Sequence, residues 1–279
     1  MENNATHTVF SNYVNTLQRM KKNYIPVPFS TLNEKFNIFP AELPTPGVIP
    51  TIGYLGVGNG GHYADTINND LDITRNYQHK STDASLFRWM PVVLRPIAND
   101  LTPVQRAGYA LRRIETYEGN QYAAYYLKRV DLSNIDVVME YRTITPDGGI
   151  VVSQFIPDSS NLNPVPEQIA VNGVNVTTSE FISVSAKVQI PWQQWEIQEY
   201  LNASNIKYGT EDAAIISEIA VVSGVDKALT VGALTYTEAI CAIVETYVQQ
   251  KIDLTSNSQN FAMNLDIGVS EPLFNIQAP

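Results

Sequence analysis

The first 85 residues contain so many prolines and glycines that they cannot form a regular sheet or a long helix by themselves. These breakers include Pro26, Pro28, Pro40, Pro44, Pro46, Pro50, Gly53, Gly56, Gly58, Gly60 and Gly61. Proline removes a backbone donor, and glycine weakens both helices and strands. Large apolar residues, including Phe29, Phe36, Phe39 and Tyr54, lie between the breakers, so the composition does not indicate simple disorder. We therefore predict an extended arm whose apolar side chains dock on another surface, such as a neighbouring subunit.

The arm begins with one segment that has a clear helical period. Phe10, Val14, Leu17 and Met20 fall on one face, which predicts a short amphipathic helix. Such a short helix is marginal alone and is expected to pack on a partner or on the rest of the chain. We predict two parts: 1–85 as N-terminal helix and extended assembly arm, and 86–279 as the body with an irregular C-terminal tail.

The middle of the chain predicts strands. Alternation of apolar and polar residues over 182–190 is the period-two pattern of a half-buried strand. Thr145 to Gly149 supplies turn residues between two β-rich runs, 137–143 and 150–156, and so predicts a hairpin. Further predictions are a strand over 86–94 interrupted at Pro91, a strand over 122–130, and a short hairpin around Asn172-Gly173.

Helices are predicted on either side of these strands. Thr102, Pro103 and Gln105 form a capping box with proline at the first helical position, and the apolar period continues to Ile114. Three more helices are predicted to begin near Pro191, Thr210 and Thr237. The order of elements gives an α+β fold, with a central antiparallel β-sheet, C-terminal helices and the long extended N-terminal arm.

The charge of the chain is divided unevenly. Residues 1–145 hold 14 basic and 13 acidic residues, a net charge of +1, whereas residues 146–279 hold 4 and 15, a net charge of −11. Docking between copies through complementary halves is one interpretation, and a solvated acidic face is the other. The acidic half argues against direct nucleic-acid binding, except as a genome passing through a lumen.

Sequence motifs for cofactors and metals are weak. The run Gly56–Gly61 matches G-x-G-x-x-G, but no clear strand precedes it and no helical period follows it. His7, His62 and His79 are the only histidines, and we interpret them as polar loop residues rather than metal ligands. The single Cys241 lies in an apolar run and excludes an intramolecular disulfide. We expect no cofactor, no metal and no catalytic residues.

Eight residues are candidates for an interface between subunits. Four are apolar residues of the arm, two are arginines of a basic section, and two are tryptophans of the first C-terminal helix: Phe29, Phe36, Phe39, Tyr54, Arg112, Arg113, Trp192 and Trp195. Aromatic and arginine side chains dominate binding energy at interfaces, although buried aromatic residues more often belong to a core.

Two segments, Arg88 to Pro103 and Ala214 to Ala220, resemble virion structural proteins of tailed bacteriophages, as do the low charge and the long arm. The resemblance implies a non-enzymatic subunit of a symmetric, multi-copy virion assembly. The expected place is the neck (the head-to-tail connector) or the tail and baseplate, as a homo-oligomeric ring in contact with other virion proteins. A capsid-associated protein is the second expectation.

Two other classes stay open. A carbohydrate-active enzyme could use clustered carboxylates such as Glu196 and Glu199, three residues apart on a predicted helix. A soluble binding module is the remaining class. The N-terminus lacks a signal-peptide pattern and no apolar run reaches membrane-spanning length, so we expect synthesis in the host cytoplasm, residence in the virion and no membrane partner.

Overall fold

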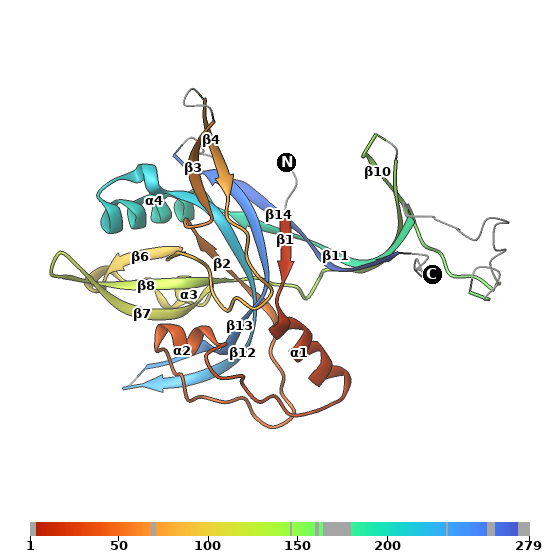
Figure 1. The fold of residues 1–279 in the computed structure, drawn as a ribbon. Coiled ribbons are helices and arrows are strands. Elements are labelled where there is room, and N and C mark those ends of the chain that lie inside the picture. Colours follow the sequence, from red (N-terminus) through yellow and green to blue (C-terminus); the bar gives the residue numbers. More distant parts are fainter. Residues whose placement is uncertain are drawn as a thin grey trace. The chain divides into compact units, whose positions relative to one another are not determined.

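The computed structural model describes residues 4–67, 71–145, 147–159, 162–163, 180–232, 234–255 and 260–272. The chain forms two compact units. Unit 1 comprises Met1–Asp131 and Trp192–Phe261, and unit 2 comprises Leu132–Pro191 and Ala262–Pro279. The fold is a mixed α+β fold in which strands predominate (Figure 1).

Unit 1 is built on an antiparallel sheet that has eight strands among the described residues. Along the sheet the order is β1-β13-β12-β2-β8-β6, with β5 added to β2 and β7 added to β8. The strands are β1 (Asn4–His7), β2 (Thr51–Gly58), β5 (Trp89–Met90), β6 (Val93–Pro96), β7 (Tyr109–Tyr117), β8 (Asn120–Arg129), β12 (Ile215–Val231) and β13 (Leu234–Asp253). A separate hairpin joins β3 (His62–Ile67) to β4 (Leu71–Asn76). The predicted central antiparallel sheet, the interruption at Pro91 and the strand over 122–130 are confirmed.

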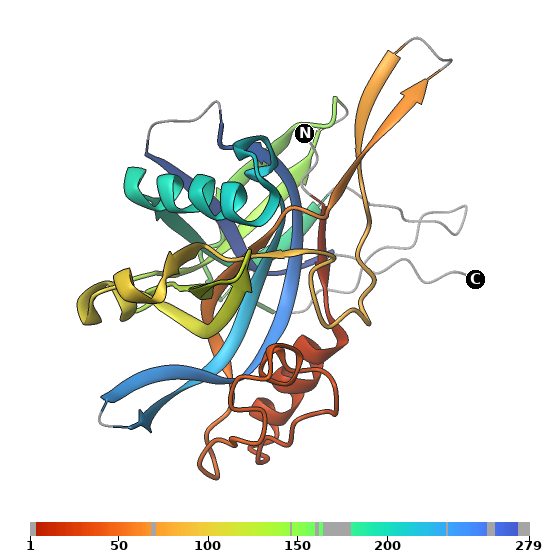
Figure 2. The ribbon, with the colours of Figure 1, turned by 90° about the vertical axis from the view of Figure 1, so that its left-hand side faces the viewer.

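The two longest strands of the sheet, β12 and β13, replace two predicted helices. They pair in one hairpin from Ile215↔Asp253 to Val231↔Leu234, and Figure 2 shows them side by side along their length. An apolar run without a clear period fits a strand buried on both faces as well as it fits a buried helix. The many β-branched residues of these runs favour the strand, and the pairing of β12 with both β2 and β13 buries it. The predicted helices that begin at Thr210 and Thr237 are therefore wrong.

Four α-helices and two short 3₁₀ helices occur among the described residues: α1 (Val9–Arg19), α2 (Leu32–Phe36), α3 (Pro103–Arg106), α4 (Gln194–Tyr208), η1 (Ile97–Asn99) and η2 (Glu211–Ala213). The predicted N-terminal helix is confirmed as α1, capped by the Thr8 side chain, and α4 is confirmed after Pro191. The capping box of Thr102 and Gln105 is also confirmed. However, α3 ends at Arg106, and the residues predicted to continue it form β7, because they pair with β8.

The predicted division at residue 85 is not found, and a separate N-terminal arm is not confirmed. Strands β1 and β2 belong to the same sheet as β12 and β13, and α1 and α2 pack against β13. Leu32, Phe36 and Ile38 lie in the hydrophobic core beside residues of β8, β12 and β13. The prolines and glycines separate short elements that tertiary contacts stabilise, which composition alone does not indicate.

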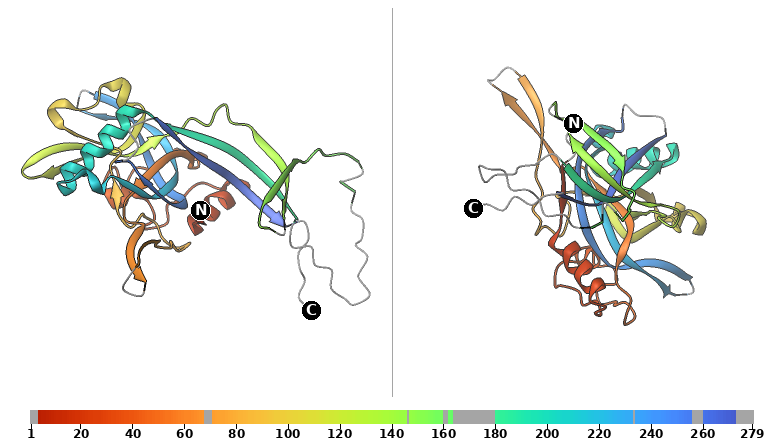
Figure 3. Two further views of the ribbon diagram at one scale, coloured as in Figure 1. Left: turned by 90° about the horizontal axis from the view of Figure 1, so that it is seen from above. Right: turned by 90° about the vertical axis from the view of Figure 1, so that its right-hand side faces the viewer.

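Unit 2 contains a four-stranded sheet in the order β10-β9-β11-β14 among the described residues (Figure 3). Its strands are β9 (Val137–Ile144), β10 (Ile150–Gln154), β11 (Glu180–Trp192) and β14 (Phe261–Pro272). The predicted hairpin is confirmed with Ile150 opposite Ile144, and the predicted strand over 182–190 is confirmed as part of β11. The prediction of an irregular tail is wrong over β14. The hairpin predicted at Asn172-Gly173 lies outside the described residues.

Candidate functional site

The glycine motif lies at the end of β2 and in the loop before β3, so no helix follows it. Its backbone amides are already used within the chain. Asn59 N donates to Arg88 O (3.1 Å), Gly60 N to Glu218 Oε1 (3.0 Å) and Gly61 N to Ser217 Oγ (2.9 Å). A phosphate cradle needs free amides at a helix N-terminus, and this loop offers neither.

Glu218, on β12, is the buried carboxylate around which this loop is organised. Besides Gly60 N, its oxygens accept hydrogen bonds from Phe87 N and Arg88 N, both at 2.9 Å. A carboxylate buried without such donors would be costly, so the three amides stabilise its charge. Close packing also explains the glycines, because a Cβ at Gly58 would lie 2.4 Å from Arg88 O.

His79 completes this cluster: it lies in a loop, as predicted, but its side chain is buried. Its Nε2 lies 3.1 Å from Glu218 Oε2, and its Nδ1 lies 3.2 Å from Asp83 Oδ2. The imidazole is stacked between the rings of Phe87 and Tyr247, with centroid distances of 4.1 and 3.9 Å. The cluster thus ties the loop before β5 to β12 and β13. In the part of the chain that the structure describes, no three His, Cys, Asp or Glu side chains group as metal ligands.

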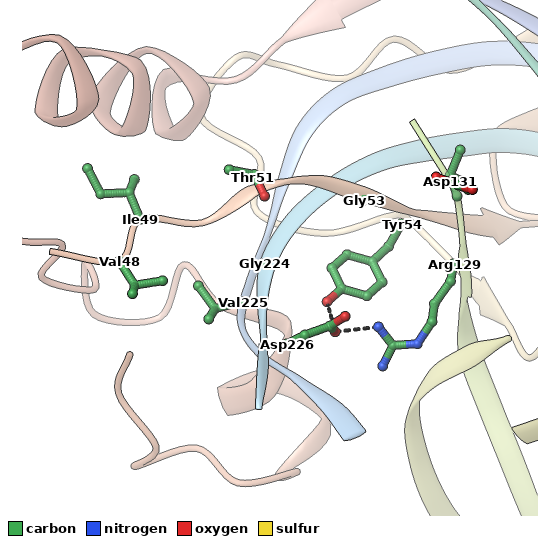
Figure 4. Close-up of a pocket in the computed structure, with 11 residues that line it drawn as sticks. Val48, Ile49, Thr51, Gly53, Tyr54, Arg129, Asp131, Gly224, Val225 and Asp226 are labelled. Carbon is green, nitrogen blue, oxygen red and sulfur yellow. Dashed lines mark hydrogen bonds and ion pairs between the residues drawn. The ribbon is translucent and has the colours of Figure 1, made fainter. Parts of the chain in front are cut away.

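A pocket of about 440 Å³ lies where β2, β8 and β12 meet (Figure 4). Asp226 at its wall accepts hydrogen bonds from Tyr54 Oη and Arg129 Nη1. Arg129 also donates to Thr237 O (3.1 Å) and lies over the Tyr54 ring. Burial and the Asp226 carboxylate raise the pKa of Tyr54 above its usual range. Because these polar groups bond to one another, they hold β2, β8 and β12 together.

The carboxylates considered for glycoside hydrolysis are also paired inside unit 1. Glu196 accepts a hydrogen bond from Tyr109 Oη (2.5 Å), forms an ion pair with Lys128 and accepts from the Gln193 amide (2.9 Å). Glu199 pairs with Arg95, whose Nη2 lies 2.6 Å from Glu199 Oε1. Both carboxylates therefore fix α4 to neighbouring strands.

The two arginines of the predicted interface have partners within their own half of the sequence. Arg112 Nη2 lies 2.6 Å from Asp100 Oδ2, and Arg113 Nε lies 2.6 Å from Glu115 Oε1. Asp100 Oδ1 also accepts a hydrogen bond from Tyr125 Oη at 2.7 Å. These contacts are internal braces, so the structure gives no support to the pairing of Arg112 and Arg113 with an acidic half of another copy.

The Asp100 contacts lead to a pH-dependent prediction. Burial alone would raise the pKa of Asp100, but hydrogen bonds from Tyr125 and Arg112 hold that pKa below its usual range. A carboxyl group whose pKa is lowered by folding stabilises the protein above its unfolded pKa of about 3.9, and loses this effect as pH falls through the folded value. We expect Asp100→Asn to lower the free energy of unfolding by about 2 kcal/mol at pH 7. The difference from the parent protein should shrink below about pH 4.

Urea unfolding of both proteins from pH 7 to pH 3 measures this difference. Asp136→Asn is the control, because Asp136 is exposed to solvent, and its effect should be small at every pH. A difference for Asp100→Asn that grows as the pH falls would contradict the assignment.

The aromatic residues predicted to form an interface are divided between core and surface. Phe36, Tyr54 and Trp192 are buried in unit 1 and so are unavailable to a partner, and Phe39 packs partly buried against the core. Phe29 is 89% exposed and Trp195 is 38% exposed. Of the aromatic candidates, only these two present a large surface to solvent.

An exposed apolar edge strand is the feature that sequence reasoning missed. β10 pairs with β9 on one side and with no other described strand, and all five of its residues are exposed. Ile150, Val151 and Val152 are 63%, 56% and 47% exposed. Val137, Met139 and Ile144 of neighbouring β9 are exposed as well. The uncharged run from Ile150 to Gln154 was the available signal, because native edge strands commonly carry lysine or proline.

Comparisons with known proteins give one match. The model of a family described as a family of unknown function, DUF7208, matches residues 1–278 and so covers both units. No curated protein and no solved structure matches the chain.

Proposed function

The chain belongs to the DUF7208 family, and we propose that it is a non-enzymatic structural subunit whose copies assemble through the edge strand β10. The observation that supports this most directly is the exposure of three consecutive apolar residues, Ile150–Val152, on that strand. An exposed, apolar strand edge is a template for pairing with another chain.

Pairing of another strand with β10 would engage both the backbone and the side chains of β10. Successive side chains of a strand point to opposite faces, so Ile150 and Val152 lie on one face and Val151 on the other. A partner strand would hydrogen-bond to the backbone groups of β10 that no described strand pairs, and its side chains would pack beside the apolar side chains of β10 on each face. Exposed apolar residues of β9 extend the same surface.

The assembly that we propose is a virion of the tailed-bacteriophage type. This part of the proposal rests on the resemblance of Arg88–Pro103 and Ala214–Ala220 to virion structural proteins. The neck is the first choice, the tail or baseplate follows, and a capsid-associated position is the alternative. No helix among the described residues is long and apolar enough to cross a membrane. The partners are then further copies of this chain and other virion proteins.

We expect Val151→Lys to weaken self-association at least tenfold. The lysine places a charge at the centre of the edge, where pairing would remove it from water. Light scattering after size-exclusion chromatography gives the oligomer mass, and electron microscopy gives its form. Val104→Lys is the matched control, because Val104 is 85% exposed but lies on the short helix α3. A monomeric parent protein at every concentration, or equal association of both variants, would contradict the proposal.

A further inference from the structure

A second pocket, of about 460 Å³, lies in unit 1 beside the glycine loop. Its polar lining comes from the loop, from β3, from the segment before β5 and from the residues around η2: Asn59, His62, Tyr77, Arg88, Thr210 and Asp212. This volume lies within the range of small-molecule sites. The Glu218 cluster fixes one wall, because Gly60 N and Arg88 N both donate to that carboxylate.

Asn59 lines this pocket and carries a buried acceptor atom that is unpaired among the described residues. The residue is only 7% exposed, and its Nδ2 donates to Ala213 O at 3.1 Å. This bond fixes the orientation of the amide, so the opposite atom is Oδ1, which is buried and has no partner among the described residues. A buried acceptor without a donor is costly, and a ligand hydroxyl or N–H group would satisfy it.

His62 provides a second unpaired atom, because its buried Nδ1 also has no partner among the described residues. Burial lowers the pKa of His62, and the charges of Lys251 and Arg88 lower it further. The imidazole is therefore neutral at physiological pH and can exchange a hydrogen bond with an uncharged group.

Arg88 provides the positive charge of the pocket. Its main chain is held on both sides, since its amide donates to Glu218 and its carbonyl accepts from Asn59 N. Its side chain is exposed and forms no ion pair with any residue that the structure describes. A guanidinium group binds a carboxylate through two parallel hydrogen bonds, so it suits a ligand that carries one such group.

We propose that this pocket binds a sugar acid, a small polyhydroxylated molecule with one carboxylate. The carboxylate pairs with Arg88, and hydroxyl groups donate to Asn59 Oδ1 and to the carboxylate of Asp212. The exposed ring of Tyr77 offers an apolar surface to the C–H face of the sugar. Inorganic phosphate fits poorly, because Asn59 Oδ1 and Asp212 accept hydrogen bonds and the loop amides are already occupied.

Calorimetric titration of the full chain with sodium glucuronate tests this inference at constant ionic strength. We expect saturable binding, with glucose, acetate and inorganic phosphate each at least tenfold weaker. Arg88→Met should weaken glucuronate binding at least tenfold, whereas Arg19→Met, which removes an exposed arginine from α1, should leave it unchanged.

Arg88→Lys keeps the positive charge but lacks the planar guanidinium group. Its affinity for glucuronate should therefore lie between those of the parent protein and Arg88→Met. Circular dichroism shows whether each variant is folded. If Arg88→Met does not fold, Arg88→Lys provides the test of the Arg88 contact. Absence of glucuronate binding, equal binding of phosphate, or binding that survives both Arg88 substitutions would overturn the inference. The assay measures binding whatever the oligomer mass, so its outcome is independent of the proposed assembly.

Discussion

Replacement of Glu218 by alanine is expected to lower the free energy of unfolding by about 4 kcal/mol, because it removes a buried, fully hydrogen-bonded charge. The amides of Gly60, Phe87 and Arg88 would lose their acceptor, and His79 would lose the carboxylate beside its Nε2. Each buried donor left without a partner costs about 1–3 kcal/mol. Since whole domains are stable by only about 5–15 kcal/mol, the variant should unfold at a much lower temperature or denaturant concentration.

Thermal and urea unfolding followed by circular dichroism measure this loss. Glu211→Ala removes an exposed carboxylate from η2 nearby in the sequence and should change stability by less than about 0.5 kcal/mol. Glu218→Gln keeps the shape of the side chain and one acceptor oxygen, so it should lie between the parent and Glu218→Ala. If Glu218→Ala unfolds like the parent protein, the cluster does not organise the loop.

The second large effect is expected at Gly58, where alanine should cost about 3 kcal/mol through overpacking. The added Cβ would lie 2.4 Å from Arg88 O and 2.6 Å from Glu218 Oε1. A backbone carbonyl cannot move away as a flexible side chain can, so β2 or the segment before β5 has to shift.

Gly53→Ala is the matched control, because Gly53 lies on the same strand and its nearest contact would be Thr51 O at 3.9 Å. We expect that substitution to be neutral or slightly stabilising, since alanine restricts the unfolded chain more than glycine does. The difference between the two urea midpoints tests the argument. Equal midpoints would mean that the loop tolerates a side chain at Gly58 and that close packing does not explain the motif.

These two variants also bear on the interpretation of the glycine motif. A nucleotide-binding loop would lose ligand affinity on such substitutions, whereas this loop is expected to lose stability. The structure assigns Gly58, Gly60 and Gly61 to close packing around Glu218 and Ser217. The sequence pattern G-x-G-x-x-G is identical in both cases, because glycine serves any close backbone approach.

Elements with strong local signals could be predicted from the sequence. The period of Phe10, Val14 and Leu17 predicted α1, and the capping box of Thr102 and Gln105 predicted the start of α3. The turn residues at 145–149 predicted the β9–β10 hairpin. In each case the determining contacts lie within a few residues of one another, so the information is contained in one short window.

The candidate sites were less predictable than these elements. Strand β10 was expected, but its place at the edge of a sheet depends on which strands pair with β9. Asn59 and Arg88 meet in one pocket although they are distant in sequence, and neither carries a motif. Phe36, Tyr54 and Trp192 were predicted at an interface, but burial is a property of the packed chain.

By itself the sequence determined α1, the start of α3, the turn between β9 and β10, and which runs are apolar, since these depend on local backbone preferences and side-chain period. Only the tertiary structure decided that residues 215–231 and 234–253 are strands and that β1 and β2, within the first 85 residues, belong to the sheet of unit 1. Contacts between elements settle both points: β12 pairs with its hairpin partner β13 and with β2, which is distant in sequence, and α2 lies in the hydrophobic core beside residues of β12 and β13. The backbone N–H and C=O groups of an apolar run can form their hydrogen bonds either within a helix or with neighbouring strands of a sheet. The second arrangement is possible only where neighbouring strands are present.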